Sequence, residues 1–223
     1  MHLYELKWSN TVEREEFFVT AHRTVRRTAG FVAALVTFGA LASGGSALAQ
    51  PLLPPGPAPV PALDLNRYLG VWNQLAAVPQ PFNLECARDT RAEYTLDPQG
   101  NIAVHNSCTT WSGGLNEIRG TAKVNDPVTG AQLHVSFPGV PSQNMLDGPT
   151  NYIVTALAPD YSWALVTDPS RLSGFVLSRS AALDAPTWEQ VKSAIAAAGQ
   201  TPCMYLTSPT TGGRSDIAPL CLR

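Results

Sequence analysis

The chain has 223 residues, of which 44% are hydrophobic and 14% are charged. This apolar content excludes an intrinsically disordered protein, and the length fits one or two domains. The formal net charge of −2 provides no general attraction to polyanions, so no nucleic-acid partner is expected. The 17 glycines and 19 prolines indicate many turns, which suits a β-rich fold better than a helical bundle.

Residues 1–49 have the features of an export signal that is cleaved from the mature protein. Three arginines within residues 23–27 precede an apolar run at 29–41, and an Ala-Leu-Ala sequence ends at Ala49. Basic residues, an apolar stretch and a small-x-small site in this order are typical of a secretory signal. We therefore expect a secreted or cell-envelope protein, with a retained anchor as the alternative. The acidic residues within 1–22 indicate a translation start downstream of Met1.

A proline-rich segment at residues 50–62 follows the predicted cleavage site. Its sequence PLLPPGPAPVP lacks the donors for a regular hydrogen-bond ladder, so it is expected to be an extended linker. One domain is predicted over residues 63–208, and residues 209–223 form a C-terminal tail.

Turn-forming sequences divide the predicted domain into eight segments with the composition of β-strands. Asp-Pro, Pro-Gly, Gly-Gly and Asp-Gly pairs provide the breaks. The expected strands are residues 71–78, 89–96, 102–110, 116–124, 131–137, 150–157, 161–167 and 172–179. Their close spacing, without a repeated strand-helix-strand unit, indicates an antiparallel meander.

Eight consecutive antiparallel strands lose their exposed edges when they close into a barrel, and a barrel of this size can hold one small ligand. Alternation along residues 131–137 supports one apolar face, because Leu133, Val135 and Phe137 fall on one side. The predicted fold class is therefore all-β, an eight-stranded antiparallel up-and-down barrel.

The apolar spacing changes to a helical period after the eighth strand. Apolar residues recur every three or four positions from Trp188 to Ala198, between Pro186 as a start signal and Gly199 as a stop signal. These features predict one C-terminal helix. A short ninth strand at residues 204–207 is expected to pair with the first strand.

Four cysteines follow the predicted cleavage site, namely Cys86, Cys108, Cys203 and Cys221. An even number in an exported chain favours two disulfides, and the absence of Cys-x-x-Cys disfavours a zinc site or a redox pair. The predicted hairpin around Gln99 brings Cys86 and Cys108 to the same end of the barrel. This placement favours Cys86–Cys108 together with Cys203–Cys221.

Four sequence blocks occur in an order that resembles the lipocalin family. The blocks are LNRYLGVW at residues 65–72, EYTLDPQGNIAVHN at 93–106, APDY at 158–161 and FVLSR at 175–179. The likeness is to bacterial outer-membrane lipoproteins and their apolipoprotein-D-like relatives, but without a lipobox cysteine at the cleavage site. It covers residues 63–208 and implies a ligand-binding barrel.

The resemblance also implies roles for signature residues. Trp72 is expected to close one end of the barrel, with the Arg179 guanidinium over its ring in a cation–π contact of roughly 0.5–2 kcal/mol. The signature set is Gly70, Trp72, Asp160, Tyr161 and Arg179, none of them expected to be catalytic. By analogy with several lipocalins, a tail cysteine can pair with an early strand, which gives Cys86–Cys221 and Cys108–Cys203 as the alternative disulfides.

Strand alternation identifies the side chains that are expected to face the barrel interior. If Trp72 points inward, Gln74 shares its side, and the other strands add mostly apolar residues. The expected lining residues are Gln74, Tyr94, Val104, Val135, Phe137, Tyr152, Val154, Phe175 and Leu177. Such a site suits a fatty acid, a lysophospholipid or a similar hydrophobic molecule, which the protein would bind or carry. The alternative is that these residues fill the barrel as a dry core.

An enzymatic function is less favoured. No G-x-S-x-G, P-loop or H-E-x-x-H motif occurs, and His105 and His134 are expected at the surface on the polar faces of their strands. We predict no cofactor and no metal site. Because a few lipocalin-type proteins are isomerases or epoxide-acting enzymes, a cryptic activity on a free Cys86 or Cys108 thiol is the second hypothesis.

A third hypothesis is an envelope interaction protein with a filled barrel. The loop at residues 138–149 contains Val140, Met145 and Leu146, and exposed apolar loop residues can mark a contact with a membrane or a protein. Peripheral membrane contact is therefore a further expectation beside the hydrophobic small molecule, whereas the sequence defines no oligomeric state.

Overall fold

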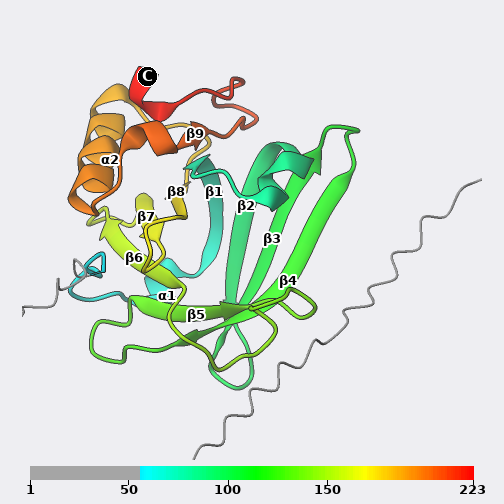
Figure 1. Ribbon diagram of the computed structural model, residues 1–223, viewed down its shortest axis with the longest axis vertical. Coiled ribbons are helices and arrows are strands. Elements are labelled where there is room, and N and C mark those ends of the chain that lie inside the picture. The colour runs from blue at the N-terminus through cyan, green and yellow to red at the C-terminus, as the bar shows by residue number, and fades with distance from the viewer. Residues whose placement is uncertain (1–55) are drawn as a thin grey trace, which may run out of the picture. The chain divides into compact units, whose positions relative to one another are not determined.

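Nine strands form one continuous antiparallel sheet in residues 56–223, the part of the chain that the computed structural model describes (Figure 1). The strands are β1 (Gly70–Ala77), β2 (Cys86–Leu96), β3 (Ile102–Thr110), β4 (Leu115–Val124), β5 (Gln132–Ser136), β6 (Tyr152–Leu157), β7 (Trp163–Thr167), β8 (Gly174–Ser178) and β9 (Leu206–Thr207). The α-helices are α1 (Leu65–Tyr68) and α2 (Ala185–Ala197), and the 3-10 helices are η1 (Pro81–Glu85), η2 (Pro202–Met204) and η3 (Leu220–Leu222). The predicted export signal lies outside the described residues.

The sheet closes because β1 pairs on both of its edges. On one edge Gln74 lies opposite Leu177 of β8, and on the other Gly70 lies opposite Tyr94 of β2. Further along the second edge β9 replaces β2, with Thr207 opposite Ala76. These pairings confirm the predicted eight-stranded antiparallel barrel with one C-terminal helix and a short ninth strand.

Strand boundaries differ from the expected ones where side chains or turns replace the regular ladder. The strand expected at residues 150–157 begins at Tyr152, because the Asn151 side chain accepts from the Val135 N–H and donates to the Val135 carbonyl. The strand expected at 161–167 begins at Trp163, because Tyr161 has a φ of 64° and closes a turn. The strand expected at 89–96 begins earlier, at Cys86. Register shifts on either side of Arg88 interrupt the alternation of side chains there, so the sequence pattern does not reveal the first residues of β2.

The two ends of the barrel differ. β1 starts beside α1, so the strand directions place the β2–β3, β4–β5 and β6–β7 connections at the same end as α1, which we call the base. The β1–β2, β3–β4, β5–β6 and β7–β8 connections lie at the opposite end, which we call the open end. In Figure 1 the β3–β4 hairpin projects away from α1, in line with this assignment.

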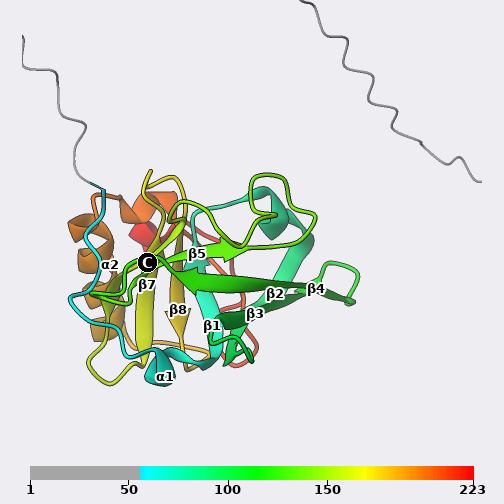
Figure 2. The ribbon, with the colours of Figure 1, turned by 90° about the horizontal axis from the view of Figure 1, so that it is seen from below.

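Two apolar clusters flank the sheet. The inner cluster includes Trp72, Tyr94, Val154 and Leu177 and lies inside the barrel. The outer cluster joins the outward side chains of β7 and β8 to α2, which lies beside these strands (Figures 1 and 2). Neither helix of residues 56–223 is long and apolar enough to cross a membrane.

Helix α2 follows the expected pattern. Asp184 caps its first turn by accepting from the Thr187 N–H, and Gly199, with a φ of 81°, follows its last turn. Val191 and Ile195 are fully buried against the barrel wall. Ahead of the barrel, the second half of the predicted linker lies along the sheet, where the Val60 N–H donates to the Val154 carbonyl at 2.8 Å.

Both disulfides link neighbouring segments. Cys86–Cys108 joins β2 to β3 with a Cα–Cα distance of 5.6 Å, and Cys203–Cys221 joins η2 to η3 with a Cα–Cα distance of 4.8 Å. This is the pairing that the hairpin geometry favours, and the alternative pairing drawn by analogy is wrong. None of the four cysteines is free, so an activity that requires a Cys86 or Cys108 thiol has no nucleophile.

Candidate ligand site inside the barrel

Trp72 and Arg179 close the base of the barrel. Trp72 is completely buried, and its indole Nε1–H donates to the Tyr68 carbonyl at 2.8 Å. The Arg179 guanidinium lies 3.7 Å from the centre of the indole ring and donates to three backbone carbonyls within residues 67–71. The cation therefore covers the ring and also fixes the chain that connects α1 to β1.

Tyr161 holds α1 against the β6–β7 turn, and Asp160 stabilises the turn itself. The Tyr161 hydroxyl accepts from the Asp64 N–H at 2.9 Å, and the Arg67 guanidinium lies 4.0 Å from the Tyr161 ring. Asp160 accepts hydrogen bonds from the Ser162 hydroxyl and N–H, which lower the pKa of its carboxyl. These contacts connect or stabilise α1 and the β6–β7 turn at the base.

Three tyrosine hydroxyls meet inside the barrel above Trp72. The Tyr152 hydroxyl is 2.8 Å from that of Tyr68 and 3.2 Å from that of Tyr94, and the Tyr68 and Tyr94 rings are stacked. Three hydroxyls carry three protons, but these contacts use only two. The tyrosine trio can therefore donate one further hydrogen bond to a molecule in the interior.

Burial keeps the tyrosine trio protonated. Desolvation raises the pKa of Tyr94 to about 12 and raises the pKa values of Tyr68 and Tyr152 well above the ordinary 10.0. Burial also raises the pKa of Tyr205, which packs under α2 and donates to Gln200. All four hydroxyls are neutral hydrogen-bond donors at physiological pH, as ordinary tyrosines are, and burial extends this neutral range to higher pH.

These four tyrosines are expected to resist ionisation in the folded protein between pH 10.0 and about 12. Since their pKa values are raised on folding, their stabilisation is fully present below pH 10.0 and is lost as the pH rises through the folded-state values. Ultraviolet absorbance of tyrosinate, followed in buffer and in urea, measures this difference. Coincident titrations in the two solvents would contradict the burial of the trio.

The expected lining residues come together along the inner face. Tyr94, Val104, Val154 and Leu177 are buried members of the inner cluster, while the side chains that pack on it with partial exposure are Val135, Phe137, Tyr152 and Phe175. Gln74 is buried opposite Leu177, and its side-chain amide donates to the Ser208 hydroxyl at 3.0 Å. Four of the expected lining side chains are thus partly exposed to solvent, and the other five are buried.

Small residues and a further polar residue also shape the interior, in addition to Gln74 and the large apolar and aromatic side chains that the sequence predicts. Ala92, Ala122 and Ala164 are buried members of the inner cluster. Gly120 faces the Phe137 ring so closely that a Cβ atom would lie 2.5 Å from it. Asn106 follows the inward alternation of β3, and its Oδ1 is buried with no hydrogen-bond partner. The alternation of inward and outward residues along each strand, which identifies the large lining residues, could also have identified these positions from the sequence.

The two histidines within residues 56–223 differ in exposure. His105 is partly exposed and its Nε2 lies 2.8 Å from Glu117, as expected for a histidine near the surface. The expectation of a surface position is wrong for His134, which is only 3% exposed. His134 does lie on the outward face of β5, but the β5–β6 loop covers it, and its ring nitrogens contact the carbonyls of Pro149 and Met145 at 2.6 and 2.9 Å.

Comparison with known proteins assigns the domain. A family model described as a Lipocalin-like domain matches residues 63–208. The chain belongs to the lipocalin family. Temperature-induced lipocalin-1 of Arabidopsis thaliana is 38% identical over 134 residues, which cover 59% of this chain and 71% of that protein. Outer membrane lipoprotein Blc of Escherichia coli (strain K12) is 33% identical over 135 residues, 60% of this chain and 72% of Blc.

More distant matches agree with this assignment. Mouse apolipoprotein D is 28% identical over 118 residues, which cover 51% of this lipocalin and 61% of that protein. Insecticyanin from the tobacco hornworm Manduca sexta shares the fold with a TM-score of 0.52 at 18% identity, over 72% of this chain and 92% of its own. Lipocalins bind small hydrophobic ligands and are generally binding or transport proteins.

Proposed function

We propose that this lipocalin binds and carries a small, mostly apolar molecule inside its barrel rather than catalysing a reaction. The observation that carries the proposal is the tyrosine trio, which places a spare hydrogen-bond donor within a mostly apolar interior. A ligand with an apolar chain and one acceptor group, such as a fatty acid or a lysophospholipid, fits this arrangement. The unpaired Asn106 Oδ1 offers an acceptor for a ligand hydroxyl.

The apolar lining provides the main attraction for such a ligand. Burial of about ten methylene groups contributes roughly 8 kcal/mol at about 0.8 kcal/mol each, before the costs of ordering the ligand. Micromolar binding corresponds to about 8 kcal/mol net, so the spare hydrogen bond or further apolar contacts must offset the cost of ordering the ligand. The lining residues proposed for this role are Gln74, Tyr94, Val104, Val135, Phe137, Tyr152, Val154, Phe175 and Leu177.

The open end carries exposed apolar side chains on several loops. Phe82 and Leu84 lie in η1, Trp111 at the β3–β4 turn, Met145 in the β5–β6 loop and Leu172 in the β7–β8 loop. The Trp111 indole donates to the Leu84 carbonyl at 2.8 Å and so connects two of these loops. We propose that this open-end rim contacts a lipid surface peripherally during ligand transfer. The two disulfides and the predicted signal support a location outside the cytoplasm.

Binding of palmitate and of lysophosphatidylcholine, followed by tryptophan fluorescence and native mass spectrometry, tests this function. We expect saturable micromolar binding that Phe137→Glu weakens by about tenfold or more, because the new carboxylate must be desolvated next to the ligand chain. Val128→Glu adds the same charge at an exposed site on the β4–β5 turn and is expected to leave binding unchanged.

Equal binding by both variants would contradict a site inside the barrel. If neither lipid binds to the unmodified protein, the barrel is filled and the carrier proposal fails. Co-sedimentation of that protein with phosphatidylcholine vesicles would then assign the open-end rim to membrane contact alone, which corresponds to the envelope interaction hypothesis.

A further inference from the structure

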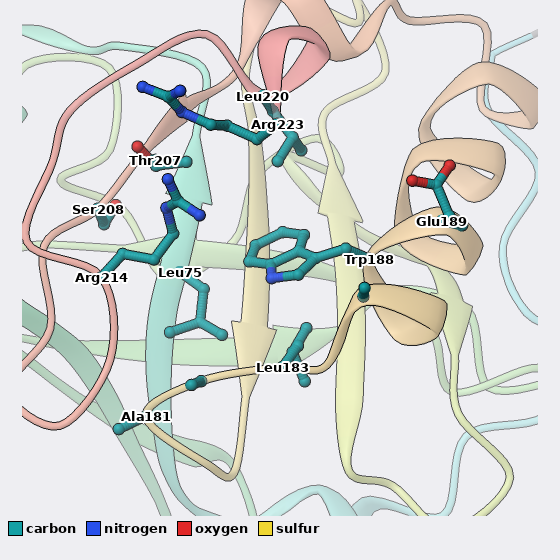
Figure 3. Close-up of a pocket in the computed structure, with 12 residues that line it drawn as sticks. Leu75, Ala181, Leu183, Trp188, Glu189, Thr207, Ser208, Arg214, Leu220 and Arg223 are labelled. Carbon is teal, nitrogen blue, oxygen red and sulfur yellow. The ribbon is translucent and has the colours of Figure 1, made fainter.

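A pocket of about 280 Å³ lies outside the barrel between α2, the segment before α2 and the C-terminal tail (Figure 3). None of its lining residues belongs to the inner cluster. Trp188 and Leu183, which line it, pack instead on the outer cluster. The pocket is therefore separate from the proposed ligand site and has a different set of walls.

Apolar side chains form most of the pocket surface. Leu75 and Leu220 are almost completely buried, and Leu183 and Trp188 are partly buried. Figure 3 shows the Trp188 ring extending from α2 across the pocket toward Arg214. A partly exposed indole of this kind offers a flat apolar face to a bound ring.

Two arginines line the tail side of the pocket. Arg214 and Arg223 both pair with Asp216, at 2.9 and 2.8 Å, so that one side-chain carboxylate serves two guanidinium groups. Lys192 pairs with Glu189 of the lining at 2.6 Å and also donates to the Arg223 carbonyl at 2.6 Å. The Nε–H of Arg214 is buried and has no hydrogen-bond partner. The lining therefore offers two guanidinium groups, and Arg214 has an unused donor.

The tail that carries the arginines is fixed in place. Cys203–Cys221 links η2, which precedes the tail, to η3 near the end of the tail, and the Thr207 hydroxyl donates to the Asp216 carbonyl at 2.7 Å. Gly213 packs so closely that a Cβ atom would lie 2.0 Å from the Ala181 carbonyl oxygen. The walls are thus preorganised, which reduces the entropy cost of binding.

We propose that this pocket is a second binding site for a small aromatic carboxylate, whose anionic group pairs with Arg214 and Arg223 while its ring lies on Trp188. Guanidinium groups suit this chemistry, because their planar donors match a carboxylate. Small inorganic anions gain no binding energy from Leu75 and Leu220, so they are expected to bind less tightly than a carboxylate that carries an apolar ring.

Naphthoate, with neutral naphthamide as its matched analogue, tests the site in titrations of the full chain followed by NMR. We expect saturable naphthoate binding that shifts the Trp188 indole N–H signal, assigned with Trp188→Phe, and about tenfold weaker binding of naphthamide. Arg214→Gln and Arg223→Gln are each expected to weaken naphthoate binding about tenfold. Arg119→Gln removes an exposed arginine that also pairs with a carboxylate, and is expected to have no effect.

Two results would overturn the second site. One is unchanged naphthoate binding by both Arg214→Gln and Arg223→Gln, with their Trp188 signals showing a folded tail. The other is a loss of naphthoate binding in Phe137→Glu without a shift at Trp188, which would place the probe inside the barrel. Palmitate binding is measured separately, so this inference and the carrier proposal fail independently.

Discussion

Replacing Trp72 with alanine is expected to lower the free energy of unfolding by about 3–5 kcal/mol, the range typical of a large buried aromatic side chain. Trp72 is fully buried, and its removal leaves a cavity at the base. The change also removes the cation–π contact between Arg179 and the indole ring, and it removes the hydrogen bond from the indole N–H to the Tyr68 carbonyl. Urea unfolding followed by circular dichroism measures the loss.

Trp111→Ala is the matched control, because it deletes the same side chain at a position that is 67% exposed. Its expected loss is within about 1 kcal/mol, since the substitution creates no cavity. Equal losses for the two variants would show that the base does not depend on Trp72. Trp72→Phe is expected to fall between them, because phenylalanine fills part of the cavity but cannot donate to Tyr68.

Removing either disulfide by a double substitution to alanine is expected to cost about 3 kcal/mol of unfolding free energy. The Cys86–Cys108 and Cys203–Cys221 bonds close chain segments of similar length, with sequence separations of 22 and 18. If the main effect is on the entropy of the unfolded chain, the two losses are therefore nearly equal. Guanidinium denaturation of the two double variants provides the comparison.

The two disulfides are expected to differ in their effect on binding. Cys203–Cys221 holds the tail that carries Arg214 and Arg223, so its removal weakens naphthoate binding and spares palmitate. Cys86–Cys108 joins two strands of the barrel wall, so its removal has no direct effect on the outer pocket. An equal loss of naphthoate binding in both double variants would show that general destabilisation, and not the tail, controls the site.

The barrel was predictable because its signals are local and repeated. Alternation along each strand and turn-forming pairs between strands fix the number of strands, and Trp188, Val191 and Ile195 mark the helix by their spacing. The same alternation correctly places His134 on the outward face. It does not reveal that the β5–β6 loop folds back over this ring, because that cover depends on contacts between segments that have no sequence periodicity.

The outer pocket could not be predicted from sequence periodicity either. Arg214, Arg223 and Trp188 come from an irregular tail and from α2, and no spacing in the sequence relates them. Their proximity follows from Cys203–Cys221 and from the antiparallel pairing of β9, which precedes the tail, with β1; both are tertiary features. Asn106 is a different case, because its inward position follows directly from the alternation of β3.

The pairing of β9 with β1 also has a consequence for the order of folding. Gln74 and Ser208, which bond across this seam, are 134 positions apart in the chain. Contacts of such separation form late and slow the folding of a domain, whereas the hairpins from β2 to β4 need only local contacts. A ribosome must therefore synthesise the chain beyond Thr207 before the seam can close. Any product truncated before this point exposes the edge of β1 and becomes a substrate for proteases or for aggregation.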